Sequence, residues 1–374
     1  MHVEPTPQPT LIDASRLVIE AMARAGADAF IGYPITPANH LYRYASERMP
    51  MMMPAPDEIT TVQWMTGLGI TGKIPVTATS FPGYALMVES INMAFMMEIP
   101  MVIVLVQRLG PATGTATCGA QGDLLLLRGT ISGGHPLPVL ATSSFADAWT
   151  LSAEAVKLAV RLRTPVVLLT TKEEMMTAKS YDVSTLPPIT PTALDTYGGD
   201  APYCTYAVDD PHGVPRFLPA GNDRHQVRYN ASTHDPCGLL QHTSPAAMAN
   251  TRRLENKIRH NLASFTFYDY DPQQGAATLV VAQGICAAAA KDAVMALRLG
   301  NKAVSLLIPK TLVPVAPVYF EMMAAYERVV IVEENINGQL AELFFGAQPP
   351  AQVRTLGALG RMITPAEIIA EVEA

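Results

Sequence analysis

The chain has 374 residues, 49% of them hydrophobic and 16% charged, and its formal net charge at pH 7 is −7. This length exceeds what one hydrophobic core usually serves, so two domains are expected, and the apolar content predicts an extensive subunit interface. The acidic balance offers no basic stripe for nucleic acid, no apolar run is long enough to span a membrane, and residues 1–10 show no secretory signal. A cytoplasmic protein that acts on small molecules is expected.

The four cysteines are far apart in the sequence. They are Cys118, Cys204, Cys237 and Cys286. None lies in a Cys-x-x-Cys pair, or at a Cys and His spacing that would ligate zinc or an iron–sulfur cluster. Any metal that the protein needs is therefore expected on another chain.

Residues 1–185 alternate helical periodicity with short apolar runs, a pattern typical of a parallel sheet covered by helices. The apolar spacing predicts a helix over residues 11–25, closed by Gly26, and a first strand over residues 27–33. Helices and strands are then expected in turn over residues 59–68, 76–79, 86–97, 101–106, 139–142, 146–161 and 165–171. This part is predicted to be an α/β domain.

Over residues 186–265 the periodicity fails, and Pro, Gly, Asp, Asn, Thr and His are frequent. This stretch, the excursion, is predicted to be irregular; it either links two domains or packs on a neighbour through its aromatic side chains. A second α/β pattern fills residues 266–374, where three parallel strands joined by crossovers are expected. The strands are expected over residues 278–284, 303–309 and 328–334, and the helices over residues 287–299, near residues 319–326 and from about residue 336.

The residues Tyr33-Pro34-Ile35-Thr36-Pro37 follow the first predicted strand. Two prolines three positions apart stiffen this loop, and the Thr36 hydroxyl is its small polar tip. Such a loop would hold one hydrogen-bonding group in place. A lone motif of this kind, however, is more often a turn with no further role.

Two ionisable residues lie at the ends of predicted elements. Glu58 opens a helix after Pro54 and Pro56, where a carboxylate either complements the helix dipole or takes part in a site. Arg108 follows a strand and leads into a Gly- and Thr-rich stretch that continues to Asp123. An arginine there either forms a surface salt bridge or binds a carboxylate through two parallel hydrogen bonds.

Several motifs occur in a fixed order, and that order is more specific than any one of them. They are GYPITP, DEI, TATS-x-PG, EIP, QR-x-GP-x-TG, QGDL, RTPVVLLT, STHD and VEEN-x-x-GQL. With these motifs the chain resembles the alpha subunit of the 2-oxoacid:ferredoxin oxidoreductases, and it looks most similar to the 2-oxoglutarate and branched-chain oxoacid members. The resemblance extends through nearly the whole chain.

In that family the alpha subunit supplies a domain that faces the aminopyrimidine of thiamine diphosphate. The resemblance implies such a pyrimidine-type α/β domain, followed by a domain like the C-terminal domain of transketolase. It also implies that Glu58 is the catalytic carboxylate, which hydrogen-bonds pyrimidine N1′. Thr36 and Arg108 would bind the substrate, the arginine neutralising its carboxylate. The residues implied to contact the cofactor are Tyr33, Pro34, Ile35, Pro82 and Gly83.

Thiamine enzymes ligate Mg²⁺ and the pyrophosphate through a Gly-Asp-Gly segment, and this chain has none. The resemblance implies that a beta subunit holds that half of the cofactor, the Mg²⁺ ion and a [4Fe-4S] cluster. A separate gamma subunit is expected to carry much of the coenzyme A contact, and ferredoxin or another carrier to accept the electrons. The implied reaction is the oxidative decarboxylation of a 2-oxoacid, with 2-oxoglutarate favoured, to an acyl-CoA and CO₂. No metal site is expected on this chain.

The chain also departs from the family pattern. Phe81 stands where glycine is common, which puts bulk beside the expected cofactor. Beyond Arg108 no second cation stands out for a distal carboxylate, and Arg43, Arg48 and Arg128 are candidates without geometry. Two alternatives therefore stay open: a half-subunit of a non-oxidative thiamine decarboxylase or transketolase-type enzyme, and a non-catalytic scaffold.

Polar residues within these motifs receive structural interpretations. Asn335 follows a predicted strand and is expected to cap the next helix. His234 and Asp235 lie in the excursion and could approach the substrate or coenzyme A, but a solvated loop histidine is expected.

Overall fold

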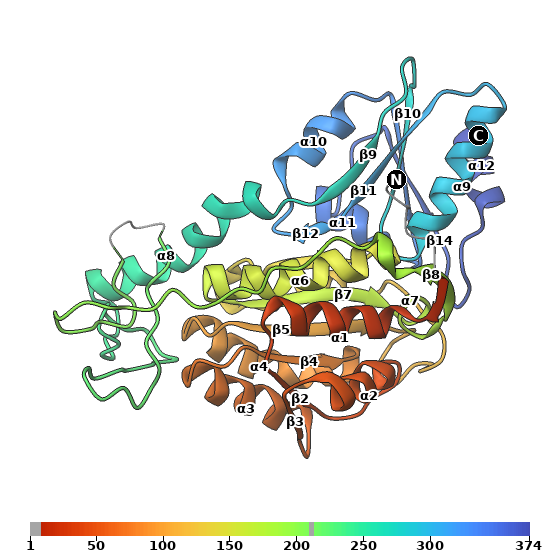
Figure 1. Cartoon of the computed structure of the whole chain (residues 1–374). Helices are drawn as coiled ribbons and strands as arrows, with labels where there is room; N and C mark the ends of the chain where they lie inside the picture. The colour runs from red at the N-terminus through yellow and green to blue at the C-terminus, as the bar shows by residue number, and fades with distance from the viewer. Residues whose placement is uncertain (1–8, 209–212) are drawn as a thin grey trace, which may run out of the picture.

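The computed structural model describes residues 9–208 and 213–374. Figure 1 shows two α/β units in contact and, on one side of the first unit, the excursion. No helix in the described part of the chain is long and apolar enough to cross a membrane.

A seven-stranded sheet forms the first unit, in the order β12-β6-β7-β5-β4-β2-β3. Neighbouring strands are parallel except β12, which runs antiparallel to β6. The strands are β2 (Ala29–Gly32), β3 (Met51–Pro54), β4 (Pro75–Thr79), β5 (Met101–Gln107), β6 (Val139–Ala141), β7 (Pro165–Thr171) and β12 (Thr311–Val313). Because the strands are parallel, their carboxyl ends meet at one edge, where α/β proteins bind ligands.

Helices cover both faces of this sheet. One face carries α1 (Ala14–Ala25), α2 (Asn39–Arg48), α6 (Phe145–Leu162) and α7 (Lys172–Met176), and the other carries α3 (Glu58–Ile70), α4 (Phe81–Met96) and α5 (Leu124–Arg128). Side chains of the central strand β5 alternate between the two faces: Val102 and Val104 contact one hydrophobic cluster, Ile103 and Leu105 the other. A strand buried on both faces reads as an uninterrupted apolar run, which is why the sequence predicted it.

The start of the chain differs from the predicted helix over residues 11–25. Residues Pro9–Ile12 form a strand, β1, antiparallel to β8 (Lys179–Asp182). The helix begins only at Ala14, because the Asp13 side chain accepts a hydrogen bond from Arg16 N at 3.1 Å and caps it. Gly26 ends the helix in the left-handed conformation, at φ 113°, as predicted.

The sequence did not predict several short or polar elements of the first unit: the five-residue helices α5 and α7, the pair β1 and β8, helix α2 and strand β3. Helix α2 buries only Leu41 and Ala45, so its apolar periodicity is weak. Strand β3 is a four-residue edge strand of three methionines and Pro54, residues with little β-propensity.

A five-stranded sheet forms the second unit, in the order β14-β13-β10-β11-β9. Its strands are β9 (Tyr268–Asp271), β10 (Thr278–Ala282), β11 (Val304–Pro309), β13 (Arg328–Glu333) and β14 (Val353–Gly357). Four strands are parallel, and β9 runs antiparallel to β11. The expectation of three strands was therefore incomplete: both edge strands, β9 and β14, are short and largely not buried, so no apolar run marked them.

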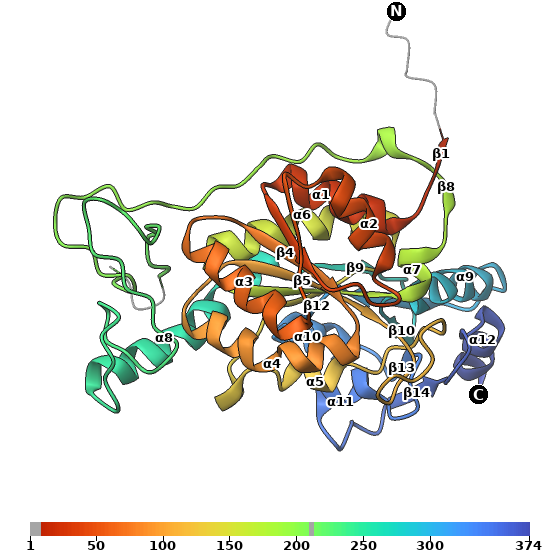
Figure 2. The same ribbon diagram turned by 90° about the horizontal axis from the view of Figure 1, so that it is seen from below.

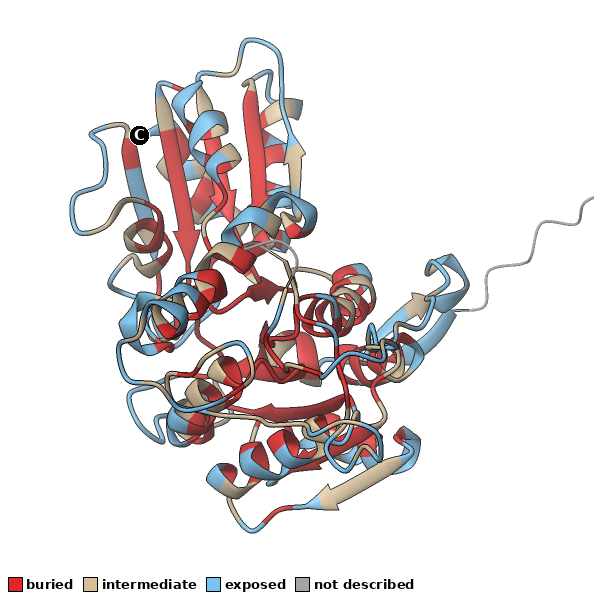
Figure 3. Ribbon diagram, turned by 90° about the vertical axis from the view of Figure 1, so that its left-hand side faces the viewer, coloured by how far each residue is buried: buried red, intermediate tan, exposed pale blue. Residues whose placement is uncertain are grey.

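Helices also cover both faces of the second sheet. They are α9 (Cys286–Leu299) and α12 (Pro365–Glu373) on one face, and α10 (Pro317–Ala324) and α11 (Gln339–Phe345) on the other. The face with α10 and α11 belongs to the hydrophobic cluster of the first unit, in which Ile103 is joined by Leu279, Ile331 and Leu340. Figure 3 shows the central strands of both sheets as buried.

Two polar links reinforce this shared core. Strand β12 leaves the second unit and pairs with β6 of the first sheet. Next to it, Lys310 Nζ lies 2.7 Å from Asp147 Oδ1 and 2.6 Å from Asp269 Oδ1, so one ammonium joins both units. The predicted domain boundaries near residues 185 and 265 stay a proposal.

The excursion extends away from the two sheets and returns through a long helix (Figures 1 and 2). This helix, α8 (Pro245–Asn261), contradicts the expectation that the stretch is irregular throughout. Ser244 caps it and Pro245 opens it, a recognisable start signal. The helix was missed because it buries Arg253 and Lys257 rather than a continuous apolar stripe. Short 3₁₀ turns are η1 (Ser132–Gly134), η2 (Val183–Thr185) and η3 (Leu262–Phe265).

A buried cluster of charges fastens α8 to the first unit. Glu98, just before β5, is fully buried and accepts from both Arg253 and Lys257; Lys257 Nζ lies 2.6 Å from Glu98 Oε2. Burial alone would raise the pKa of Glu98, but the cations Arg253 and Lys257 hold it well below its usual range. Lys257 also donates to the Arg163 carbonyl at 3.1 Å. This cluster lies before the amino end of β5, opposite the carboxyl edge of the sheet.

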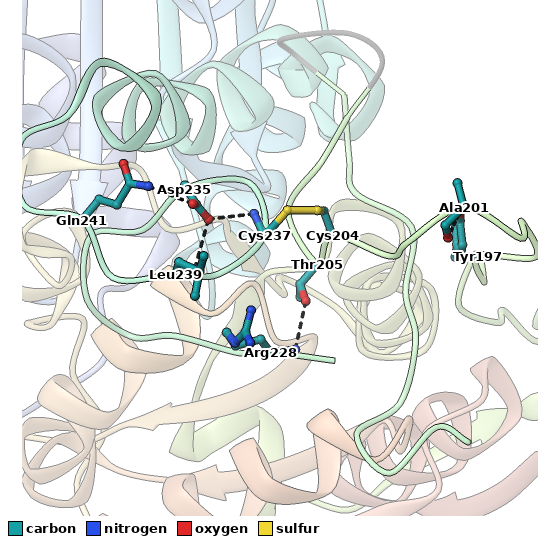
Figure 4. Close-up of a disulfide and its surroundings, with 9 residues drawn as sticks. All are labelled: Tyr197, Ala201, Cys204, Thr205, Arg228, Asp235, Cys237, Leu239 and Gln241. Carbon is teal, nitrogen blue, oxygen red and sulfur yellow. Dashed lines mark hydrogen bonds between the residues drawn. A yellow bond between two sulfur atoms is a disulfide. The ribbon is translucent and has the colours of Figure 1, made fainter. Parts of the chain in front are cut away.

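The excursion is closed by a disulfide between Cys204 and Cys237, shown in Figure 4. Beside it, the Asp235 carboxylate accepts hydrogen bonds from Cys237 N at 2.9 Å, Leu239 N at 3.0 Å and Gln241 Nε2 at 2.8 Å. The bond links positions 33 residues apart, a separation at which the sequence carries no pairing signal.

His234 is not solvated, and that expectation was wrong. The residue is fully buried, its ring stacks on Tyr206 with centroids 4.0 Å apart, and its Nε2 lies 3.0 Å from Asn250 Nδ2. Burial lowers the pKa of His234. The ring is a core group of the excursion, held at the end of the sheet opposite the carboxyl edge.

Candidate active site

The loops that carry the predicted site residues meet at the carboxyl edge of the first sheet. The loop over residues 33–37 follows β2, Ser80 to Gly83 follow β4, and Arg108 follows β5. Strands β2, β4 and β5 are consecutive neighbours in the sheet, so these loops lie side by side. These loops are separated in the sequence by complete helices and strands, so their distance along the chain does not reveal that they are neighbours.

Arg108 and Thr36 are in direct contact. Arg108 Nη1 donates to the Thr36 carbonyl at 2.5 Å, and the residue is 6% exposed. The Thr36 hydroxyl accepts from Asn39 Nδ2 at 3.0 Å, which orients it and leaves its own hydrogen free to donate. The two predicted substrate-binding residues are therefore together, each with a hydrogen-bond donor to spare.

Glu58 and Gly83 form a second contact pair. Asp57 caps α3 by accepting from Thr60 N at 2.7 Å, and this places Glu58 in the first turn, where it is 7% exposed. A Cβ built on Gly83 would lie 2.7 Å from Glu58 Oε1 and 2.2 Å from Thr79 Oγ1. Glycine is therefore required at position 83, because the Glu58 carboxylate and the Thr79 hydroxyl occupy that space.

The carboxylate of Glu58 makes no hydrogen bond with any residue in the ranges 9–208 and 213–374. A mostly buried side chain whose carboxylate has no protein partner is suited to contact a ligand. Glu58 is thus available to share a hydrogen bond with a bound molecule.

Other buried polar atoms at the same edge also have no partner among the described residues. They are Oγ1 of Thr77, Oγ of Ser80, Oε1 and Nε2 of Gln107, Nε of Arg108 and Oδ2 of Asp123. Native structures satisfy most buried polar groups, so their concentration on β4, β5 and the following loops marks a site that is completed by something else.

A cavity of about 330 Å³ opens beside Arg108 between the two units. Phe81 contributes to its wall together with Leu109, Pro111, Ile336 and Leu359. Phe81 is the first residue of α4, two positions before Gly83. Phe81 therefore adds bulk to the wall of this cavity, close in sequence to the glycine that packs on Glu58.

Three ionisable residues line this cavity: Arg108, Asp123 and Glu334. Burial raises the pKa of Asp123 to about 7, although Arg108 opposes the shift. Burial likewise raises the pKa of Glu334 to about 7, against a hydrogen bond that its carboxylate accepts from Ile363 N. Arg108 is the single cation among these lining residues.

The other candidate cations lie elsewhere. The Arg43 guanidinium sits 4.6 Å from the centroid of the Tyr44 ring, Arg48 Nε lies 2.5 Å from Glu20 Oε2, and Arg128 is exposed in the last turn of α5. None of the three lines the cavity.

The remaining predicted cofactor residues lie around these pairs. Tyr33 and Pro34 are exposed, Ile35 is half-buried against the cluster of α1 and α2, and Pro82 is half-buried in the first turn of α4. None of the four lines the cavity. No group of three or more His, Cys, Asp or Glu side chains that could hold a metal occurs in the part of the chain that the structure describes.

Gln121, which the sequence analysis did not select, joins the two units under the cavity. Its Oε1 accepts from Glu334 N at 2.9 Å, and its Nε2 donates to the Gln283 carbonyl at 2.8 Å. Its carbonyl accepts from Asn335 Nδ2 at 3.0 Å, while Asn335 Oδ1 accepts from Gly338 N at 2.8 Å at the start of α11. Asn335 therefore makes the predicted contacts at the start of the helix. Gln121 is the first residue of the QGDL motif, and this motif could have pointed to it.

A family model described as pyruvate flavodoxin/ferredoxin oxidoreductase, thiamine diphosphate-binding, matches residues 20–212. This chain belongs to that family. The matched residues contain all the loops at the carboxyl edge, including Glu58, Gly83, Arg108 and Asp123. The resemblance inferred from the order of motifs is confirmed.

Curated relatives from this family are named as subunits. A 2-oxoglutarate synthase subunit KorA of Archaeoglobus fulgidus is 37% identical over 163 residues, 42% of this chain and 47% of that protein. A KorA subunit of Methanothermobacter thermautotrophicus is 28% identical over 360 residues, 92% of this chain and 93% of that one. The ketoisovalerate oxidoreductase subunit VorB of the same organism is 36% identical over 165 residues, 43% and 47% of the two chains. The alignment with the first of these relatives spans about half of its length.

Solved structures show the same fold. A 2-oxoglutarate:ferredoxin oxidoreductase from Magnetococcus marinus superposes with a TM-score of 0.90 and 24% identity, over 99% of this chain and 66% of that chain. It is described with 2-oxoglutarate, coenzyme A and succinyl-CoA bound. A split-gene transketolase, an inactive beta4 tetramer, superposes with a TM-score of 0.55 and 15% identity over 97% of both chains. The predicted α/β fold class, a thiamine-binding domain with a transketolase-like partner domain, is confirmed.

Proposed function

We propose that this chain is the alpha subunit of a coenzyme A-dependent 2-oxoacid oxidoreductase, active in complex with a beta subunit. One observation carries the proposal: an unpartnered buried carboxylate, Glu58, and a buried guanidinium, Arg108, lie in neighbouring loops at one sheet edge. The first suits a ring nitrogen of a cofactor, and the second suits a substrate carboxylate. Relatives named as 2-oxoglutarate synthase and ketoisovalerate oxidoreductase subunits support the reaction class.

The residues present fit the aminopyrimidine half of thiamine diphosphate. Gly83 lets the Glu58 carboxylate lie against the first turn of α4, and that carboxylate has no hydrogen-bond partner in the described residues. Glu58 would hold a proton between its carboxylate and pyrimidine N1′, with Tyr33, Pro34, Ile35 and Pro82 around it. When bound, the cofactor supplies the carbanion-stabilising centre at which a 2-oxoacid loses CO₂.

Arg108 and Thr36 would position the substrate. The guanidinium would neutralise the carboxylate of the 2-oxoacid, and the Thr36 hydroxyl, held by Asn39, would donate towards the 2-oxo group. The apolar wall with Phe81 and Ile336 would exclude water from the bound acid. Of the relatives' substrates we favour 2-oxoglutarate, whose distal carboxylate would then need a cation from the partner subunit.

The partners are inferred from what the chain does not contain. The sequence has no Gly-Asp-Gly segment, so a beta subunit would bind the pyrophosphate with Mg²⁺, and it would carry the [4Fe-4S] cluster that removes electrons. A separate gamma subunit would contact coenzyme A, and ferredoxin or another carrier would receive the electrons. The cytoplasm is the proposed location because coenzyme A is an intracellular carrier. The Cys204–Cys237 disulfide is unusual for that compartment.

Co-expression with the candidate beta subunit tests this function. The complex is expected to reduce ferredoxin or a viologen dye only when a 2-oxoacid, coenzyme A and thiamine diphosphate are all present. The isolated alpha chain is expected to be inactive. Decarboxylation by the isolated chain would refute the shared site, and turnover with a partner that holds no iron–sulfur cluster would favour the non-oxidative alternative.

Changing Arg108 to alanine is expected to raise the KM for the 2-oxoacid roughly 10- to 150-fold, with a smaller change in kcat. The reason is that a hydrogen bond to a charged group contributes about 1.5–3 kcal/mol. Steady-state kinetics of the complex measures both constants. Arg128→Ala is the control, because Arg128 is exposed on α5 outside the cavity, and it should leave KM unchanged. An unaltered KM in Arg108→Ala would exclude this arginine from substrate binding.

A further inference from the structure

Asp123 is buried in the wall of the 330 Å³ cavity and has no structural partner there. Its side chain is at the start of α5 and does not cap that helix. Asp123 Oδ2 is buried without a hydrogen bond, and no ion pair within 4.0 Å joins the carboxyl to Arg108 in residues 9–208 and 213–374. A carboxyl group in this position costs stability and gains no partner within the described fold, which is typical of a group kept for a ligand.

The same cavity receives the side chain of Arg108, whose Nε is also buried without a partner. Asp123 feels the charge of Arg108, so the two groups are electrostatic neighbours. A ligand between them would meet the Arg108 guanidinium, just after β5, on one side and the carboxyl of Asp123 on the other. Glu334, the third ionisable group of the cavity, turns its carboxylate to Ile363 N instead.

We propose that Asp123 binds the carboxylate end of the 2-oxoacid as a neutral carboxylic acid, whose O–H donates a hydrogen bond beside the guanidinium of Arg108. This inference rests on the proposed function and adds a second substrate-binding residue to it. As an ionised group Asp123 would repel the substrate carboxylate and compete for Arg108, so the residue must keep its proton for substrate to bind.

The state of this proton makes substrate affinity depend on pH. Burial raises the pKa of Asp123 to about 7, and the charge of Arg108 limits that rise. Below that pH the acid is neutral and binds the carboxylate; above it the ionised form accumulates and binding weakens. One required proton corresponds to a KM that rises up to about tenfold for each further pH unit.

The test compares the KM of the assembled complex at pH 6.5 and pH 8.5. The wild-type KM is expected to be at least tenfold higher at pH 8.5. Asp123→Asn keeps a neutral hydrogen-bond donor, so its KM should change less than about threefold. Glu334→Gln is the matched control, since it removes a carboxyl of similar pKa from the same cavity, and it should keep the wild-type ratio. The proposal would be overturned if Asp123→Asn kept the wild-type ratio of KM at pH 8.5 to KM at pH 6.5. It would also be overturned if Glu334→Gln abolished that ratio.

A second readout needs no variant, in case Asp123→Asn folds poorly. The amide of the 2-oxoacid lacks the carboxylate, so its inhibition constant with the wild-type complex should stay constant between pH 6.5 and pH 8.5. Equal weakening of acid and amide would overturn the role of Asp123. Absence of turnover with every 2-oxoacid at every pH would instead refute the proposed function, so the two failures are distinguishable.

Discussion

Changing Glu58 to glutamine is expected to lower turnover by the assembled complex roughly 10²- to 10⁴-fold, the usual range for loss of a positioned acid or base. Glu58 is buried, packs against Gly83 and has no hydrogen-bond partner in the described fold. A glutamine amide fills the same volume but cannot take or return the proton at a ring nitrogen. The loss should therefore appear in kcat, with little change in the KM for the 2-oxoacid.

Steady-state kinetics with the 2-oxoacid, coenzyme A and the electron acceptor measures this effect. Glu47→Gln removes an exposed carboxylate from α2 and should leave turnover unchanged. The thermal unfolding midpoint of each variant separates a catalytic loss from a folding defect. Normal turnover in the Glu58→Gln complex would contradict the catalytic assignment and favour the non-catalytic scaffold that Phe81 suggested.

Changing Glu98 to glutamine is expected to lower the free energy of unfolding by about 3–5 kcal/mol, the usual cost of removing one partner from a buried ion pair. Arg253 and Lys257 are both buried, and each depends on this carboxylate. Without Glu98 two cations would remain in the core with backbone and amide partners alone. Because the cluster fastens α8, the excursion should become more open to proteases in the variant.

Urea unfolding monitored by circular dichroism measures the change. Glu255→Gln is the control: Glu255 pairs with Arg259 on the exposed side of the same helix, where removal of a surface pair should cost less than about 1 kcal/mol. Equal losses of unfolding free energy in both variants would show that Glu98 stabilises the fold no more than a surface charge does. The pKa of Glu98 is lowered in the fold, so its stabilisation is complete above the ordinary carboxyl pKa and is lost in strong acid.

The strands of the sheets that are buried on both faces were predictable from sequence, because such strands must be apolar throughout. Strands β4, β5, β7, β10, β11 and β13 were all recognised in this way. The polar elements were not. Helix α8 hides Arg253 and Lys257 against Glu98, and that pairing is invisible until residues 155 and 159 positions apart are brought together. His234 was misjudged for the same reason, since a polar residue in a Pro- and Gly-rich stretch has no local mark of burial.

By itself, the sequence determined the fold class and the family, and it selected Thr36, Glu58, Gly83 and Arg108, because each follows or opens a regular element in a recognisable motif. Only the tertiary structure decided which of them touch: Arg108 with Thr36, and Glu58 with Gly83. It also singled out Asp123, because the pKa of its carboxyl is raised by burial, in a cavity that it shares with Arg108. Local motifs encode the ends of elements, whereas burial and electrostatic environment arise from chain segments that meet at one edge of a sheet.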